Sequence, residues 1–317
     1  MGTRMKLTAF IEKHTLLLLL LTACILALAF QGSRGLLEPD EGRYSNVALQ
    51  ILQHNDWISL YRNQDSLHFT KPPLTYWLIA ASVSVFGHHE WAVRLPMALA
   101  FIFSVFLVFQ LGKIFVPKRA WLPALFFLGS PATFFAPTTV NTDTVLAAML
   151  TLAMTCYAQT RFAGKSNYWL DAMWLAFGLA FLTKGPPALL PLLVVLVFDI
   201  WHKQAKSLFR PLGLLAFVLV GFSWYLVVIL RHPGLLDYFL GHEVYARIAT
   251  DEHKRNSEWY GALKIYLPVL LLGVLPWILV LLKQYRAKTL TLEPLPLNQR
   301  RFLWLWFLLP LLIFSLS

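Results

Sequence analysis

The sequence predicts an all-α polytopic membrane protein, and three observations lead to this class. The 317 residues are 58% hydrophobic and only 14% charged. The mean hydropathy is +0.60. Apolar runs close to the length of about 20 residues that crosses a bilayer recur along the chain. Because no soluble class combines these features, we expect a bundle of membrane helices.

The apolar runs define the elements of this bundle. The runs predicted to be transmembrane helices are 15–30, 93–112, 120–140, 145–160, 168–183, 186–201, 212–230, 265–282 and 302–316. A shorter apolar run, 74–86, carries Thr75, Tyr76 and Trp77 and is predicted to be an interfacial helix. A true span is the alternative for this run.

The basic residues indicate the orientation of the bundle. If the N-terminus is cytosolic, the segments that face the cytosol hold 16 of the 27 Lys and Arg residues; these segments are 1–14, 113–119, 161–167, 202–210 and 283–301. This distribution satisfies the positive-inside rule. The net charge of +11 is therefore explained by topology, and no nucleic-acid partner is expected.

The N-terminal segment has two interpretations. Arg4, Lys6 and Lys13 precede the apolar run, and Ala27-Leu28-Ala29 follows its leucines, as in a cleaved signal peptide. We favour an uncleaved anchor, because cleavage would separate the polar loop that follows from the helix that positions it.

An acidic and aromatic run follows the first span directly. It reads Glu38-Pro39-Asp40-Glu41-Gly42-Arg43-Tyr44. Ionisable groups are costly near a bilayer, so in a chain with few charges they indicate a pathway or an active site. Segment 43–53 then places Tyr44, Val47, Ala48 and Ile51 at helical spacing. We expect an amphipathic helix that lies on the membrane.

Further charged residues are predicted to reach the same, outer face of the membrane. Lys71 precedes two prolines, and Asp143 and Lys184 stand at turns between apolar runs. The converging set is Asp40, Glu41, Arg43, Lys71, Asp143, Lys184 and Arg247 or Arg255. Cations that hold a phosphate beside a carboxylate that handles a hydroxyl or amine suit chemistry on a phosphorylated lipid.

Several of the charged residues also have a purely structural interpretation. Arg43 and Lys71 are long side chains that can reach lipid headgroups. Asp143 is a candidate N-cap of the helix that follows it. Asp56 is predicted to be a solvated loop charge. The functional hypothesis depends on the convergence of the set.

The histidines and cysteines give no metal signature. His68, His242 and His253 lack the spacing of the His-Glu-x-x-His motif. Cys24 and Cys156 both fall inside apolar runs, where cysteine is usually a small packing residue. We therefore expect no metal ligands.

Several motifs in fixed order resemble the polytopic, lipid-carrier-dependent glycosyltransferases of the GT-C fold. The resemblance is strongest to the aminoarabinose lipid A transferases and to the dolichyl-phosphate-mannose protein mannosyltransferase-like proteins of bacteria. The motifs are 38–44 after the first span, Phe69-Thr70-Lys71-Pro72-Pro73 followed by Tyr76-Trp77, Asp143, Leu182-Thr183-Lys184-Gly185, and Glu243 with Arg247 before Trp259-Tyr260.

The resemblance implies one transmembrane glycosyltransferase domain over 1–317, with interfacial helices in its first external loop. Such an enzyme moves a sugar from a polyprenyl-phosphate carrier to a lipid A, glycan or protein acceptor at the outer face of the bacterial inner membrane. The implied catalytic residues are Asp40, Glu41 and Asp143. The implied donor-phosphate ligands are Arg43, Lys71, Lys184 and Arg247, and the implied acceptor or loop residues are Tyr44, Tyr76, Glu243 and Arg255.

The sequence departs from this family at two points. Many members carry an acid, sometimes associated with a metal, where this chain has Thr70. We therefore expect no required cofactor, with a divalent metal as the alternative that Thr70 argues against. The chain also stops at Ser317, next to an apolar run, where the family usually continues. We expect a partial sequence.

Two other functional classes remain open at this stage. A transporter or lipid flippase would place ionisable residues and broken helices near the middle of the bilayer. The charged residues here are instead predicted to gather at one edge. An assembly scaffold is the third class, and the convergent charged set argues against it.

Overall fold

The structure is a computed structural model that describes residues 2–37, 39–239, 241, 260–287 and 294–316. The structure is 76% helical with almost no sheet, which confirms the predicted class. The strands described are β1 (Tyr61–Asn63) and β2 (Ser66–Leu67), which pair antiparallel as one short hairpin. This hairpin stands beside α2 in the first loop.

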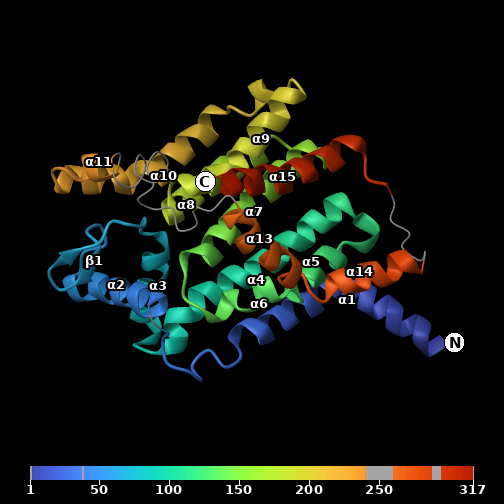
Figure 1. The fold of residues 1–317 in the computed structure, drawn as a ribbon, viewed down its shortest axis with the longest axis horizontal. Helices are drawn as coiled ribbons and strands as arrows, with labels where there is room; N and C mark the ends of the chain where they lie inside the picture. Colours follow the sequence, from blue (N-terminus) through green and yellow to red (C-terminus); the bar gives the residue numbers. More distant parts are fainter. Residues whose placement is uncertain (1, 38, 240, 242–259, 288–293, 317) are drawn as a thin grey trace.

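The helices largely follow the apolar runs of the sequence (Figure 1). The α-helices are α1 (Gly2–Leu28), α2 (Asp40–His54), α3 (Leu74–Phe86), α4 (Glu90–Phe115), α5 (Trp121–Leu128), α6 (Pro131–Phe134), α7 (Thr142–Arg161), α8 (Tyr168–Lys184), α9 (Leu190–Trp201), α10 (Pro211–Arg231), α11 (Leu235–Asp237), α13 (Gly261–Leu272), α14 (Trp277–Arg286) and α15 (Leu297–Leu316). The 3₁₀ turns are η1 (Pro117–Arg119), η2 (Ala136–Thr138), η3 (Pro186–Leu189) and η4 (Ala205–Ser207).

Two of the described helices, α4 and α10, are by themselves long and apolar enough to cross a membrane. The bent pair α13 and α14 adds a third candidate if the pair forms one span. The helical stretches 14–28, 74–86 and 186–201 are apolar but shorter. Length and composition thus support fewer of the spans than the sequence predicts.

Two predicted spans are wrong as single helices. The run 120–140 divides into α5, α6 and η2, because α5 ends at Leu128 and Ser130 is extended before Pro131 starts a new turn. The run 265–282 divides into α13 and α14, whose axes differ by 70°. Pro276 stands directly before α14, where it has no N–H to continue the hydrogen bonds of a preceding helix.

Helix α8 lies in the centre of the bundle, between α7 and α10. Glycines allow α8 and α10 to approach closely. A side chain at Gly178 would meet the backbone of Phe217 at 3.2 Å, and one at Gly213 would meet the ring of Trp174 at 2.7 Å. Small residues at such crossings let helices pack backbone to backbone, which is the usual means of helix association in membranes.

The apolar face of α2 packs on protein, and the predicted position of this helix on the membrane stays a prediction. The helix itself and its periodicity are confirmed, and Val47 and Ile51 are fully buried in a core shared with α3 and with Trp224 of α10. The Trp224 indole donates a hydrogen bond to the carbonyl oxygen of Ile58 at 2.9 Å, which ties the first loop to α10.

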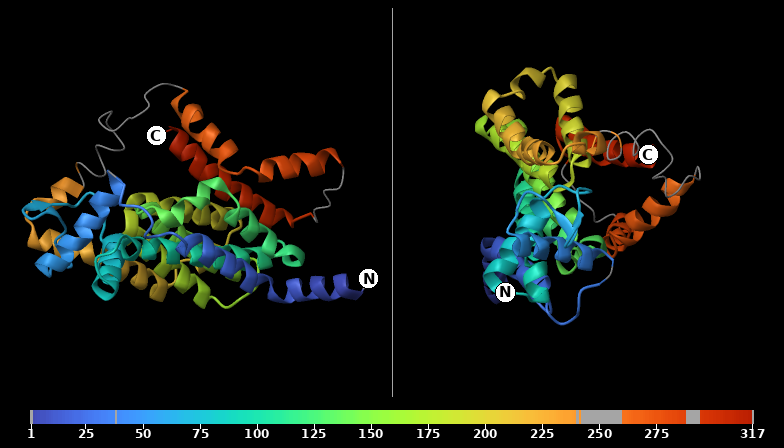
Figure 2. Two further views of the ribbon diagram at one scale, coloured as in Figure 1. Left: turned by 90° about the horizontal axis from the view of Figure 1, so that it is seen from below. Right: turned by 90° about the vertical axis from the view of Figure 1, so that its left-hand side faces the viewer.

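The two ends of the bundle therefore differ in construction. Figures 1 and 2 show α2, α3, the hairpin and α11 gathered at one end. We call this the loop end, and it also includes the start of α7 and the ends of α8 and α10. The opposite, far end consists of the end of α7, the start of α8, the end of α9 and the start of α10.

Candidate active site

The first turn of α2 presents an accessible carboxylate. The helix begins at Asp40, where the helix dipole favours negative charge. Arg43, one turn later, donates a hydrogen bond to Asp40. The side chains of Asp40 and Arg43 are 60% and 35% exposed. Both partners of this pair are thus within reach of a ligand.

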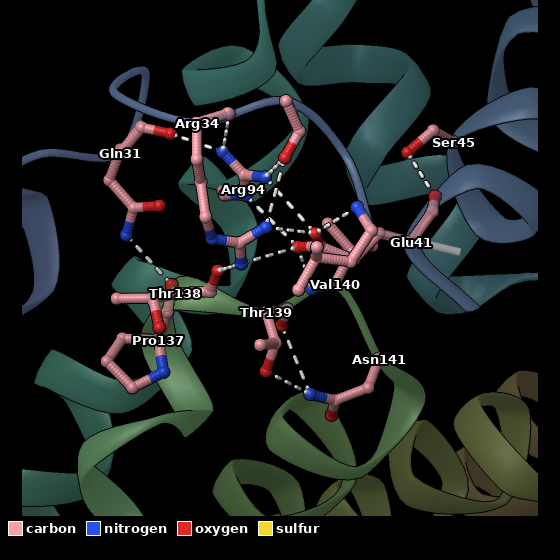
Figure 3. Close-up of polar contacts among 12 residues, drawn as sticks. Gln31, Arg34, Glu41, Ser45, Arg94, Pro137, Thr138, Thr139, Val140 and Asn141 are labelled. Carbon is pink, nitrogen blue, oxygen red and sulfur yellow. Dashed lines mark hydrogen bonds and ion pairs between the residues drawn. The ribbon is translucent and has the colours of Figure 1, made fainter. Parts of the chain in front are cut away.

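The neighbouring carboxylate, Glu41, is buried instead. Figure 3 shows it surrounded by donors from three segments of the chain. The Arg34 guanidinium donates to Oε2 of Glu41 at 2.6 Å. The Arg94 guanidinium donates to both carboxylate oxygens, at 3.1 Å each. The backbone N–H groups of Leu37 and Val140 donate at 2.8 Å and 3.0 Å. Glu41 therefore joins the first loop, α4 and the start of α7.

This environment holds Glu41 in its ionised form. Burial by itself would raise the pKa of the carboxyl, but the hydrogen bonds from Arg94, Arg34 and the two backbone N–H groups lower it to about 2. A carboxylate with so low a pKa is a weak base at neutral pH. The geometry thus indicates that Glu41 orders the backbone beside Asp40.

Arg94 completes this network, and sequence reasoning missed it. Its side chain is 1% exposed. Besides Glu41, it donates to the carbonyl oxygens of Gln31, Arg34 and Gly35 at 2.5, 3.0 and 2.8 Å. A lone arginine at the start of an apolar run was the available signal, because such a charge requires buried partners.

The start of α7 contributes a second exposed carboxylate. The N-cap of this helix is Asn141, whose side-chain oxygen accepts from the N–H of Thr144 at 2.8 Å. The alternative that Asp143 caps the helix is therefore wrong. Asp143 is 67% exposed and accepts a hydrogen bond from Lys184 at the end of α8.

Tyr44 is a buried residue near the start of α2. Its ring is buried, the Arg43 guanidinium lies over it at 5.2 Å, and the centroid of the Tyr76 ring is 5.8 Å away. Burial raises the pKa of its hydroxyl; the charge of Arg43 opposes this rise, and the charges of Asp40 and Asp143 add to it. Carboxylates of two distant segments therefore act on one side chain.

His68 lies on the other side of Tyr76. It is buried, and its Nε2 is 3.2 Å from the Tyr76 hydroxyl and 3.0 Å from the Thr70 hydroxyl. These contacts fix the loop residue that comes directly before Lys71.

Cations surround this imidazole. Burial, and then the positive charges of Arg43, Arg62 and Lys71, lower the pKa of His68 to about 4. The ring is therefore neutral at neutral pH. Arg62 was not among the predicted residues, because its hairpin gives no sequence signal that places it near Arg43. The loop end thus concentrates positive charge beside Asp40.

The contacts bring most of the predicted set together. Asp40, Glu41, Arg43, Tyr44, Lys71, Tyr76, Asp143 and Lys184 all lie at the loop end, linked through the interactions above. Their catalytic and binding roles stay predictions. Glu243, Arg247 and Arg255 fall outside the described residues. In the part of the chain that the structure describes, no three His, Cys, Asp or Glu side chains could hold a metal ion together.

Asp56 does not have the solvated position that was predicted. Its carboxylate accepts from the N–H groups of Ile58 and Ser59 at 2.9 and 3.2 Å and from Arg231 at 3.1 Å. Burial would raise the pKa of this carboxyl, but the donors outweigh burial and lower it. Asp56 therefore anchors the first loop to the end of α10.

Comparison with known proteins identifies the family of this chain. Residues 70–230 match the family model described as dolichyl-phosphate-mannose-protein mannosyltransferase. The chain belongs to this family. The match covers the helices from α3 to α9 and nearly all of α10, and it includes Lys71, Asp143 and Lys184.

Individual relatives of this mannosyltransferase family member are similar to it over almost the whole chain. An undecaprenyl phosphate-α-4-amino-4-deoxy-L-arabinose arabinosyl transferase 2 of Pseudomonas fluorescens is 31% identical over 294 residues, which are 90% of this chain and 52% of the relative. An arabinosyl transferase of the same description from Pectobacterium carotovorum is 32% identical, over 97% of this chain and 55% of the relative. The chain thus spans about half the length of these curated relatives.

Solved structures agree on the fold. ArnT from Cupriavidus metallidurans bound to undecaprenyl phosphate superimposes with a TM-score of 0.81 at 24% identity, over 95% of this chain and 55% of that chain. Its apo state gives a TM-score of 0.78. The family member therefore has the predicted GT-C membrane fold, and it is a bacterial membrane protein.

Proposed function

We propose that this protein is a membrane glycosyltransferase that takes a sugar from a polyprenyl-phosphate carrier. The observation that carries the proposal is the accessible Asp40 beside Arg43, at the loop end of a chain whose relatives are named for an undecaprenyl phosphate-linked arabinose donor. A carrier-linked sugar arrives within the membrane. A site at the end of an apolar bundle is suited to meet it.

The cations of the loop end would bind the carrier phosphate. As the bond between the sugar and the phosphate oxygen breaks, negative charge grows on the departing phosphate. Arg43, Lys71 and Lys184 supply positive charge there, with Arg247 as a further ligand predicted from the sequence. Fixed charges of this kind stabilise a transition state without needing to reorganise.

Asp40 would orient or deprotonate the acceptor. Its exposed carboxylate can accept a hydrogen bond from an incoming hydroxyl or amine while Arg43 turns to the phosphate. Asp143, which is also exposed, would assist as the second catalytic carboxylate and would position Lys184. We reassign Glu41 from catalysis to positioning, because its buried oxygens already have their donors.

The acceptor proposed is lipid A, with glycan and protein acceptors as alternatives. If the reacting group of the acceptor is itself a phosphate, it is already ionised and needs no strong base. Asp40 would then position the two reactants. Tyr44 and Tyr76 are buried, so they would support the site from within the core. Glu243 and Arg255 remain acceptor or loop residues predicted from the sequence.

A transporter or lipid flippase receives less support. The buried acids of the far end, Asp171 and Asp199, pair with Arg210 and Arg161 where helices meet loops. Transporters instead bind their ions and substrates on ionisable groups near the middle of the bilayer.

Replacement of Asp40 tests the proposal directly. Transfer of label from a polyprenyl-phosphate sugar to lipid A would be followed in membranes that contain the full-length protein. We expect Asp40→Asn to abolish transfer, because the amide keeps the size and loses the charge. Asp237→Asn, at an exposed carboxylate of α11, is the matched control and should keep the activity of the wild type. Full transfer by Asp40→Asn would contradict the assignment.

The proposed location places the loop end in the periplasm, at the outer face of the inner membrane. A cysteine introduced at Asn63 in the hairpin should then react with an impermeant thiol reagent added outside spheroplasts. A cysteine at Lys206 in η4 should react only after the membrane is permeabilised. The reverse pattern would overturn the orientation.

A further inference from the structure

A polar hollow lies beside the candidate active site, between α2 and the hairpin. Its volume is about 580 Å³, and only polar residues line it: Asn46, Gln50, Asn63, Gln64, Asp65 and Ser66. Two of them come from α2 and four from the hairpin, two of these in its strands and two in its turn. The lining offers amides, one carboxylate and one hydroxyl, without a cation to hold a phosphate.

The helix face that forms this hollow begins at the active site. Arg43, Asn46 and Gln50 stand at positions i, i+3 and i+7 of α2, so they share one face of the helix. At a rise of about 1.5 Å per residue, Arg43 and Gln50 are about 10 Å apart along the axis. A ligand extended along this face would reach the hollow from the reacting centre.

Gln50 carries an unused hydrogen-bonding group into this lining. Its side chain is 6% exposed, and its Nε2 donates to Gln53 at 2.8 Å. Its Oε1 is buried and has no partner among the described residues. Buried polar atoms nearly always have partners, so an orphan atom requires an explanation. The terminal torsion of glutamine is soft, and a rotation can turn this oxygen toward a donor that enters the hollow.

Other residues of the lining are fixed in place or have no ionic partner. The Asn46 amide donates to the carbonyl oxygen of Arg62 and lies 3.4 Å from Oδ1 of Asn63, so α2 fixes the hairpin at the rim. Asp65 makes no ion pair with any described residue, although it carries the charge of the lining.

We propose that this hollow binds a sugar ring of the acceptor. The amide groups of the lining donate and accept hydrogen bonds and the Asp65 carboxylate accepts them, and such a set matches the neighbouring hydroxyls of a saccharide. The hydroxyl of such a ring supplies the donor that Gln50 lacks. This inference rests on the proposed function. It gives the acceptor substrate a second binding contact on the protein, about 10 Å along α2 from Arg43.

The test separates acceptor binding from chemistry. The variants are Gln64→Ala combined with Asp65→Asn at the turn, and Gln50→Leu on the helix, with Asp237→Asn as control. Transfer is measured in membranes over a range of lipid A concentrations. Because each lost hydrogen bond typically weakens binding about threefold to tenfold, the KM for lipid A should rise by that factor in each variant. The kcat and the KM for the donor should stay unchanged.

A second readout guards against misfolding. Gln50→Leu removes an unpartnered buried oxygen together with one hydrogen bond to Gln53, so the Tm of the purified variant should be close to that of the wild type. Binding of deacylated lipid A headgroup, followed by tryptophan fluorescence, should weaken in both variants. An unchanged KM for lipid A and unchanged headgroup binding in both variants would overturn the inference.

Failure of the proposed function would look different. If the wild type transferred no sugar while the headgroup still bound, and bound less well in the variants, the hollow would be a saccharide site and the transferase assignment would be wrong. If the wild type transferred sugar with variants indistinguishable from it, the transferase assignment would stand and the hollow would have no part in it.

Discussion

The carboxylates at the two ends of the bundle are used in different ways. At the far end, Asp199 is fully buried and accepts from the Tyr157 hydroxyl at 2.5 Å and from Arg161. Asp171 accepts from Arg210 at 2.9 Å and from the N–H of Gly213. Each acid joins one helix to its neighbour, and neither has an oxygen left for a ligand.

At the loop end, Glu41 follows this pattern, and Asp56 is likewise anchored by several donors. Asp40 and Asp143 are more than half exposed, and each pairs with one cation that is also partly exposed. Exposed ion pairs contribute only about 0–1 kcal/mol to stability. Such pairs can therefore open for a substrate at little cost. The comparison teaches that burial and the number of donors separate structural acids from available ones, although both kinds stand within one turn of α2.

The largest expected effect is the loss of a buried partner. Arg94→Met leaves Glu41 charged and without two of its donors, which should lower the free energy of unfolding by about 3–5 kcal/mol. Asp199→Ala, at the far end, should have a similar effect by stranding Arg161. Both are measured as Tm and yield of the detergent-purified protein. If either variant matched the wild type in Tm, the structural assignment of that network would be wrong.

The next largest effect is expected on transfer activity and not on the stability of the fold. Lys71→Ala removes a cation from the proposed phosphate site and should lower the kcat/KM of transfer on the order of a hundredfold. Lys206→Ala, at the far end, is the matched control and should leave transfer unchanged. Equal losses in the two variants would show that the loop end has no special part in phosphate binding.

Acid should weaken the loop end through Glu41. Its folded-state pKa of about 2 lies below its ordinary value of 4.5. The stabilisation is thus fully present above the ordinary pKa and is lost as the pH falls from 4.5 towards 2. The wild type should be more stable than Glu41→Gln at neutral pH, and the difference in Tm should shrink over this range. A difference that stayed constant with pH would contradict the charged network.

The smallest effect is expected at Asp143. Asp143→Asn breaks an exposed ion pair with Lys184 and should change the free energy of unfolding by less than about 1 kcal/mol. Asp171→Asn, which alters a nearly buried acid with two kinds of donor, should cost more. Chemical denaturation of the two variants side by side gives the comparison, and a reversed order would break it.

Sequence reasoning succeeded where a feature depends on local pattern. The apolar runs predicted the helical class, the period of 43–53 predicted α2, and the run 74–86 matches α3. The convergence of Asp40, Lys71, Asp143 and Lys184 on one end also followed from helix order, because neighbouring membrane helices alternate in direction. The divided runs 120–140 and 265–282 were missed because mean hydropathy does not register the backbone effects of Ser130, Pro131 and Pro276.

The sequence by itself determined that this chain is a helical membrane protein of the dolichyl-phosphate-mannose-protein mannosyltransferase family, with its charged motifs at one end. Only the tertiary structure decided which acidic side chains are buried among donors and which are exposed. Asp40 and Glu41 are adjacent and chemically alike, yet Arg34, Arg94 and the N–H of Val140 converge on one alone. Those donors come from 7, 53 and 99 residues away. The charge and exposure of a carboxylate depend on neighbours in space, and packing of the whole chain brings them there.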